Sequence, residues 1–335
     1  MPGIIEVSAR IGAMIVHAAA HAGVAPERLY AATGFDAAVA ADPDAHIQIE
    51  VETALWEEAA RLTGDDAFGL HCAEQIRPGA FDVLDYAVRT APTLRASLER
   101  LARYNRLLHD VAVFTLVDRG EVVRVEHSLG GARQSRHAAE FTLASLLVIG
   151  GQISGAPLRA LAVDLHPPPP VRTVEHERLF GVRPRFGTEV NAVELERAAL
   201  ERPVPTADPA LSAVVVRHAE ALLRARPAPS PSTTERVRGL VLASLADGDA
   251  SLAAIAARLR MSERSLQRRL ADEDTTFDEL LEDVRRDLAV RYLASPTMAI
   301  AEVAYLLGYS EPSAFHRAFK RWTGRTPAEA RRRAA

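Results

Sequence analysis

Residues 232–335 contain one helical pattern twice, and this repeat constrains the fold more than any other feature of the chain. The segments 252–259 and 300–307 carry apolar residues at matching places, at an offset of 48 (252 to 300), with a small alanine where a second helix must approach closely. Each segment ends in a short turn, and a serine follows, Ser262 or Ser310, that is well placed to cap a second helix. The pattern predicts two helix-turn-helix units, and two copies in register are a far more specific signal than one.

The predicted second helix of each unit has an apolar face and a polar outer face. Leu266 and Leu270 match Phe315 and Phe319 at an offset of 49 (266 to 315), as if the second turn held one extra residue. The residues between them are polar and are expected to face outward. This arrangement is typical of recognition helices that enter the major groove of DNA.

A long amphipathic helix is predicted over 276–294, between the two units. Its apolar stripe runs through Phe277, Leu280, Val284 and Leu288, and Tyr292 continues it. Its roughly 19 residues span about 28 Å, close to the ~34 Å repeat of a DNA turn. A rod of that length can hold two recognition helices on successive major-groove segments of one DNA face.

The outer faces of the two second helices carry the predicted DNA contacts. Arginine and glutamine make bidentate contacts to guanine and adenine edges, whereas the alternative interpretation is a solvated helix face. Residues 317–333 hold seven cations and one acid, and such a cluster suits phosphate contacts, which supply affinity without sequence information. The predicted contacts are Ser262, Arg264, Ser265, Gln267 and Arg268 in the first unit, and Ser313, His316, Arg317, Lys320 and Arg321 in the second.

Three prolines spaced by small residues mark a boundary near residue 230. They cannot continue a helix or join a sheet, so a semi-rigid extended linker is predicted over 226–231. It separates an N-terminal domain, 1–225, from a predicted all-α DNA-binding domain, 232–335.

The N-terminal domain is predicted to be α+β, with helices and a small, mostly antiparallel sheet covered by helices on one face. Thr93 is placed to cap one of the helices. The periodicities predict helices over 11–25, 47–63, 94–108, 137–149 and 171–180, a hairpin over 111–117 and 122–125, and further strands over 158–165 and 190–195.

The charge is split between the two parts of the chain, and the cysteine content favours a cytoplasmic protein. Residues 232–335 hold 17 Lys+Arg against 15 Asp+Glu, a charge of +2, and the remainder holds 23 against 29, a charge of −6, which together give the net −4. The single cysteine, Cys72, excludes an intramolecular disulfide and fits a reducing compartment. The apolar stretch 11–25 is interrupted by two histidines, so it is expected to be a buried helix and not a signal peptide or membrane anchor.

No pattern in the chain predicts catalysis, a metal site or a cofactor. His17 and His21 lie four residues apart without a third ligand nearby, which favours a structural or surface pair. The glycines near residue 150 lack the lysine and hydroxyl residue of a phosphate loop. The chain is therefore expected not to be an enzyme.

Residues 232–335 resemble the DNA-binding domain of the AraC/XylS family of bacterial regulators. The resemblance rests on the stretches 261–270, 300–304 and 308–319 and on the tail 322–327. Two positions depart from the usual pattern: Arg260 stands where a turn glycine is common, and Ala330 stands where a tyrosine usually follows the Thr-Pro turn. Residues 77–81, 93–104, 178–181 and 205–209 resemble the arabinose-binding-domain-like regulatory domain of one branch of that family.

The resemblance implies an effector-responsive activator that binds double-stranded DNA, contacts RNA polymerase and has a regulatory domain for a small organic effector or for homodimer formation. Arabinose is not implied as the ligand. The alternative is a DNA-binding repressor or architectural protein whose N-terminal domain only dimerises. A ligand that changes DNA affinity or transcription distinguishes the two.

Overall fold

The computed structural model describes residues 5–42, 44–130, 132, 134–205, 207–226, 233–245, 249–273, 275–293, 298–309 and 311–334. The chain divides into two compact units, an N-terminal unit over Ile4–Pro229 and a C-terminal unit over Ser230–Ala335. Each unit has a hydrophobic core of its own. The predicted linker lies outside the described residues, except for Arg226. No helix in these ranges is both long and apolar enough to cross a membrane.

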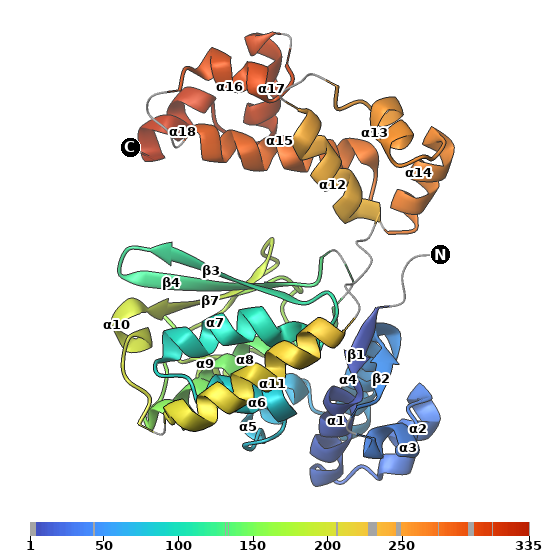
Figure 1. Cartoon of the computed structure of the whole chain (residues 1–335), viewed down its shortest axis with the longest axis vertical. Helices are drawn as coiled ribbons and strands as arrows, with labels where there is room; N and C mark the ends of the chain where they lie inside the picture. The colour runs from blue at the N-terminus through green and yellow to red at the C-terminus, as the bar shows by residue number, and fades with distance from the viewer. Residues whose placement is uncertain are drawn as a thin grey trace. The chain divides into compact units, whose positions relative to one another are not determined.

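A five-stranded sheet forms one layer of the N-terminal unit, and helices cover one of its faces (Figure 1). The strand order is β3-β4-β7-β5-β6, and only the β5–β6 pair is parallel. The β3–β4 hairpin turns at Gly120, whose φ of 68° is a left-handed conformation that glycine adopts easily. The strands are β3 (Val113–Arg119), β4 (Val122–Ser128), β5 (Ala162–Leu165), β6 (Arg185–Phe186) and β7 (Asn191–Glu196).

The rest of the N-terminal unit is mostly helical. A small two-stranded sheet of β1 and β2 packs with α1 and α4, while α5 lies along α8 and α6 contacts both α7 and α11. The elements are β1 (Glu6–Ser8), α1 (Ala9–His21), α2 (Pro26–Thr33), α3 (Ala37–Ala41), β2 (His46–Gln48), α4 (Ile49–Thr63), α5 (Phe68–Glu74), α6 (Asp82–Arg89), α7 (Leu94–Tyr104), η1 (Asn105–Leu107), α8 (Arg136–Ser154), α9 (Val174–Phe180), α10 (Arg197–Leu200) and α11 (Pro209–Ala225).

The two faces of the sheet differ in chemistry. Val123 and Val125 of β4 are fully buried in the core, whereas Arg124 between them points to the opposite face. The Arg124 guanidinium pairs with Asp164 at 2.7 Å and with Glu126 at 2.8 Å. The face away from the core is therefore closed by ion pairs, as expected for an antiparallel sheet with one apolar face.

A buried carboxylate on α8 joins this helix to α9. Glu140 is fully buried, accepts hydrogen bonds from Arg136 and His176, both at 2.7 Å, and lies 3.5 Å from His137 Nδ1. Burial alone raises the pKa of a carboxyl group, but the His137 and His176 rings and the Arg136 charge outweigh it and lower the pKa of Glu140 to about 2. Glu140 is therefore ionised at neutral pH.

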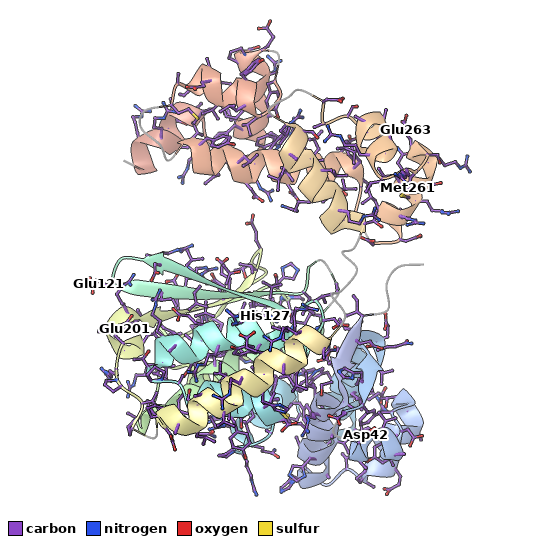
Figure 2. The ribbon with its side chains drawn as sticks, viewed as in Figure 1. Asp42, Glu121, His127, Glu201, Met261 and Glu263 are labelled. Atoms are coloured by element: carbon purple, nitrogen blue, oxygen red, sulfur yellow. The ribbon has the colours of Figure 1, made fainter. Side chains whose placement is uncertain are left out.

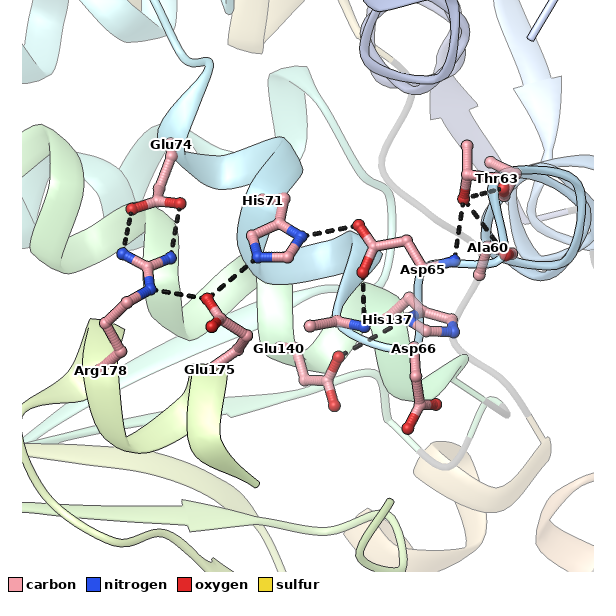
Figure 3. A network of polar contacts seen from close by, with 12 residues as sticks. Ala60, Thr63, Asp65, Asp66, His71, Glu74, His137, Glu140, Glu175 and Arg178 are labelled. Atoms are coloured by element: carbon pink, nitrogen blue, oxygen red, sulfur yellow. Dashed lines mark hydrogen bonds and ion pairs between the residues drawn. The ribbon is translucent and has the colours of Figure 1, made fainter. Parts of the chain in front are cut away.

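A chain of ion pairs beside Glu140 ties α5 to α9 (Figure 3). His71 donates to Asp65 at 2.6 Å and to Glu175 at 3.1 Å, and these two bonds raise the pKa of His71 to about 9. Arg178 donates to Glu175 and holds both oxygens of Glu74 at 2.8 Å. The helices that cover the sheet are thus fixed by charge as well as by apolar packing.

The C-terminal unit consists of helices around one continuous core. Residues from both predicted repeats and from the helix between them share this core. In Figure 1, α13 and α14 lie toward one end of α15, and α16 and α17 toward the other. The helices are α12 (Thr233–Ser244), α13 (Leu252–Arg258), α14 (Glu263–Ala271), α15 (Phe277–Leu293), α16 (Ile300–Leu306), α17 (Pro312–Thr323) and α18 (Pro327–Ala334).

The predicted fold class is confirmed, and several predicted elements are corrected. The strand predicted over 158–165 begins only at Ala162, because Leu158 packs into the notch that Gly150 leaves on α8. The helix predicted over 94–108 ends at Tyr104, where a 3-10 turn follows, and Thr93 caps it by accepting from the Ala96 amide at 3.1 Å, as predicted. The elements that the sequence patterns did not predict are β1, β2, β6, α2, α3, α5, α6, α10, α11, α12 and α18.

Candidate functional site

The two helix-turn-helix units repeat the same backbone geometry. Helix α13 begins 48 residues before α16 (252 to 300), and α14 begins 49 residues before α17 (263 to 312), so the second turn does hold one extra residue. Arg260 adopts a left-handed φ of 55°, and Gly308 at the equivalent place has a φ of 73°. The turn requires this conformation in both units, although only the second has the glycine that adopts it without strain.

Replacing Arg260 by glycine is expected to stabilise the C-terminal unit by about 1 kcal/mol. A left-handed backbone costs a residue with a Cβ roughly 1–2 kcal/mol, and the greater freedom of glycine in the unfolded chain offsets part of the gain. Scanning calorimetry of the full-length chain measures the change. Gly308→Ala is the matched control, expected to destabilise the same unit, and a lower stability of Arg260→Gly would contradict the prediction.

The starts of the two recognition helices differ. Ser262 caps α14 as predicted: its Oγ accepts from the Ser265 amide at 3.2 Å and donates to the Ser265 hydroxyl at 2.9 Å. Helix α17 is preceded by Glu311, which makes no side-chain cap bond, and begins with Pro312, which has no amide hydrogen to be capped. The predicted cap Ser310 lies outside the described residues.

The predicted base-reading side chains extend from the surface without internal partners. Arg264, Gln267, Arg268 and Arg317 are exposed, and within the described part of the chain no hydrogen bond or ion pair engages them. Figure 2 shows Glu263, at the start of α14, on the outside of the unit. Of the other predicted contacts, Ser262, Ser313, His316 and Lys320 are exposed, and Ser265 is half-buried.

Arg321 differs from the other predicted contacts that carry a positive charge because its side chain has a partner among the described residues. Its guanidinium pairs with Glu282 of α15, which also accepts from Trp322 Nε1 at 3.2 Å. The side chain is still 62% exposed. Part of its charge is therefore compensated within the protein, and this lowers its expected contribution to phosphate binding.

Two arginines connect parts of the C-terminal unit that are distant in sequence. The sequence patterns did not single them out. Arg285 of α15 donates to Leu307 O at 3.0 Å, and its guanidinium lies 4.7 Å from the centre of the Tyr309 ring, so it holds the turn of the second unit. Arg258 of α13 donates to Ser244 Oγ at 2.7 Å and joins the first unit to α12. Both contacts link residues at least 14 apart, and no local pattern predicts them.

The carboxylate of Glu273 makes a further contact within the C-terminal unit. It accepts from the Thr233 amide at 2.9 Å and from the Thr234 amide at 2.8 Å, which are the first amides of α12. Burial would raise the pKa of Glu273, but these threonine hydrogen bonds outweigh it and lower the pKa. The end of the first recognition helix is thereby fastened to the start of the unit.

The N-terminal unit contains a pocket of about 120 Å³. Side chains of α4, α6, α7 and α8 line it together with residues of β3 and β4. Most of these side chains are apolar, and Trp56 and Phe141, with ring centres 5.1 Å apart, are both among them. A concave, mostly apolar site with a few polar groups is typical of a small-molecule binding site.

Both units match known protein families. The model described as "Arabinose-binding domain of AraC transcription regulator, N-term" matches residues 23–204, and the model described as "Helix-turn-helix domain" matches residues 255–333. Together they include most of the pocket-bearing unit and both second helices of the helix-turn-helix units.

Several known proteins are similar over most of this chain. The ornithine utilization regulator of Pseudomonas aeruginosa is 32% identical over 312 residues, which cover 92% of this chain and 91% of that protein. The HTH-type transcriptional regulator VirS of Mycobacterium tuberculosis is 32% identical over 284 residues, 83% of this chain and 82% of that protein. The crystal structure of the transcriptional regulator CdpR from Pseudomonas aeruginosa is 26% identical with a TM-score of 0.42, covering 83% of this chain and 90% of that one.

The family models account for both units, and the relatives are similar along nearly the full length of the chain. The repeated turn geometry and the two exposed recognition helices agree with this match. The chain belongs to the AraC family and is a DNA-binding transcription regulator with an arabinose-binding-type N-terminal domain.

Proposed function

We propose that the chain is an effector-responsive activator that reads two adjacent major-groove segments with α14 and α17. The observation that carries this proposal is the repeat itself: two units with equivalent turns share one core with α15. The 17 residues of α15 give it a length of about 25 Å, which suits recognition helices placed on one face of the DNA.

The proposed division of labour follows the two units. Residues 1–225 form the regulatory domain, 226–231 the linker and 232–335 the DNA-binding domain. The predicted contacts in α14 and α17 bind the DNA, and as an activator the protein contacts RNA polymerase, with or without homodimer formation. It acts by binding and not by catalysis, which agrees with relatives that are named as regulators.

The pocket favours effector response over a domain that only dimerises. A dimerisation domain has no use for an internal hollow, which lowers stability in proportion to its volume. The pocket lies beside helices of the regulatory unit, where a bound molecule can change their packing. Coupling of the usual size, about 1–3 kcal/mol, would change DNA affinity or transcription roughly 5- to 150-fold.

Arg268→Ala is expected to weaken binding to the native DNA site by about 1–3 kcal/mol and to relax the preference at particular base positions. The reason is that Arg268 lies on the exposed face of α14 with no internal partner to share its charge. Binding of the full-length protein to specific and scrambled duplexes measures both effects.

Arg269→Ala is the matched control, since it removes the same charge from the next position of the same helix. It should weaken binding to both duplexes alike and by less. If Arg268→Ala also lowered affinity for both duplexes equally, the assignment of α14 to base reading would be wrong.

A further inference from the structure

The pocket of the N-terminal unit is small, and its lining is mostly apolar. It holds about 120 Å³, somewhat less than an engineered hollow of about 150 Å³ that accepts benzene. Among the described residues that line it there is no lysine or arginine. An anionic ligand would therefore find no opposite charge to compensate its loss of water.

Most polar groups in the lining are already used within the protein. Their hydrogen bonds go to backbone carbonyls or neighbouring side chains and leave little free capacity for a ligand. The bonds are Ser97 Oγ to Val88 O at 2.9 Å, Asn105 Nδ2 to Ala112 O at 3.1 Å, Ser135 Oγ to Glu57 Oε1 at 2.6 Å, Thr142 Oγ1 to Ala138 O at 2.8 Å, and Arg89 Nε to Asp85 Oδ1 at 2.7 Å.

Glu52 and His109 at the pocket wall are likewise engaged. Glu52 accepts from Trp56 Nε1 at 3.1 Å, and its other oxygen lies 3.6 Å from His109 Nε2. The Val111 amide donates to His109 Nδ1 at 3.4 Å, which leaves the Nε2 hydrogen directed at Glu52. The Glu52 carboxylate thus accepts one hydrogen bond and faces the His109 N–H, and these are contacts that a bound cation would have to displace.

His127 has a buried polar atom that is not engaged in this way. It is 3% exposed, and its Nδ1 has no hydrogen-bond partner among the described residues. The ring lies 4.8 Å from the centre of the Phe114 ring, and Figure 2 shows it inside the N-terminal unit on β4. Burial, and to a lesser extent the nearby His109, lowers the pKa of His127 to about 4, so at neutral pH the ring is uncharged and can both donate and accept.

We propose that this pocket binds an uncharged, largely apolar molecule of about the size of phenol, whose single polar group hydrogen bonds with His127. This proposal rests on the proposed effector response and adds the chemical class of the effector. A buried polar atom without a partner is rare in native proteins, and a ligand hydroxyl or carbonyl would supply the partner. A sugar fits poorly, because each of its hydroxyls would need a partner and most of the other polar groups in the lining are engaged.

The test compares small probes on the full-length chain by ligand-observed NMR titration. Phenol and toluene share a ring and differ in the hydroxyl, while benzoate adds a negative charge and arabinose adds hydroxyls. Phenol is expected to bind best, toluene more weakly, and benzoate and arabinose not measurably. The proposal would be overturned if benzoate or arabinose bound more tightly than phenol. It would also be overturned if neither phenol nor toluene bound.

The role of His127 is tested by His127→Phe and His127→Gln. His127→Phe should weaken phenol binding about tenfold, the contribution of one neutral hydrogen bond, and leave toluene binding unchanged. His127→Gln keeps a hydrogen-bonding group and should restore part of the phenol affinity, and circular dichroism verifies that both variants fold. Equal phenol affinity in the wild type and in His127→Phe would show that the polar group lies elsewhere.

Ala138→Leu provides an independent variant, because Ala138 lines the pocket from α8 and the larger side chain reduces its volume. It should abolish binding of both phenol and toluene, and unchanged binding would place the probes outside the pocket.

Failure of the proposed function can be distinguished from failure of the ligand class. If phenol binds at His127 but changes neither DNA affinity nor transcription, the ligand class stands and the effector response is wrong. If transcription responds to arabinose while phenol does not bind, the response stands and the ligand class is wrong.

Discussion

The fragment 232–335, made without the rest of the chain, is expected to fold alone and to bind duplex DNA with an affinity that falls about a thousandfold between 50 and 200 mM salt. Neutralising about six phosphates releases their counterions and gives a log–log slope near −5. The cations are available for this because Arg264, Arg268 and Arg317 have no internal partner among the described residues.

The fragment can fold alone because its core is complete. Phe315, Phe319, Leu266 and Leu270 are all at most 1% exposed and belong to one hydrophobic cluster confined to the C-terminal unit. Glu273 caps the first helix from within the same unit. Circular dichroism tests folding, and titration of a fluorescent duplex at several salt concentrations gives the slope.

Two controls make the salt experiment specific. The same fragment with Arg264, Arg268 and Arg317 changed to alanine should give a slope shallower by about three if each residue contacts one phosphate or displaces one counterion. It should lose more affinity for the native site than for a scrambled duplex if these side chains also read bases. A folded wild-type fragment with no measurable affinity for DNA at low salt would refute the proposal of two DNA-reading units.

The C-terminal unit was predictable because its signals are local. Each signal comes from residues within one or two helical turns of one another. This holds for the apolar stripes, the Ser262 cap and the extra residue of the second turn, all of which the structure confirms. The contacts of Arg285 and Arg258 were not predicted, because they depend on packing between helices. The predicted DNA contacts remain predictions. The structure shows that all of them except Ser265 are exposed, and that Arg264, Gln267, Arg268 and Arg317 have no competing partner in its described part.

The N-terminal unit was less predictable because its structure depends on distant residues. The β3–β4 hairpin has a local turn signal, whereas β6 has only two residues and exists because it pairs with β5. The pocket brings Glu52, His109 and His127 together from α4, a loop and β4. No spacing in the sequence indicates that these three side chains meet, so a pocket could be predicted but not its polar wall.

Glu140→Ala is expected to destabilise the N-terminal unit by about 3–5 kcal/mol. The substitution removes a fully buried carboxylate and leaves His176, whose side chain is 1% exposed, without its acceptor, while Arg136 keeps only its contacts to Asp66. Removing one member of a buried ion pair costs this much because the remaining partner is left buried without compensation. Scanning calorimetry of the full-length chain should show the transition of this unit lowered by roughly 10 °C.

Glu58→Ala is the matched control, since Glu58 also lies on a helix and pairs with an arginine, Arg61, but at the surface. It should change the stability by no more than about 0.5 kcal/mol.

The pH dependence of stability provides a second check, because the pKa of Glu140 in the folded protein, about 2, lies below its usual value of 4.5. The stability that the carboxylate contributes is therefore complete above pH 4.5 and is lost as the pH falls towards 2. The difference between the wild type and Glu140→Ala should stay constant from pH 7 to 5 and shrink below 4.5, and a constant difference down to pH 3 would show that lost packing, not lost charge, destabilises the variant.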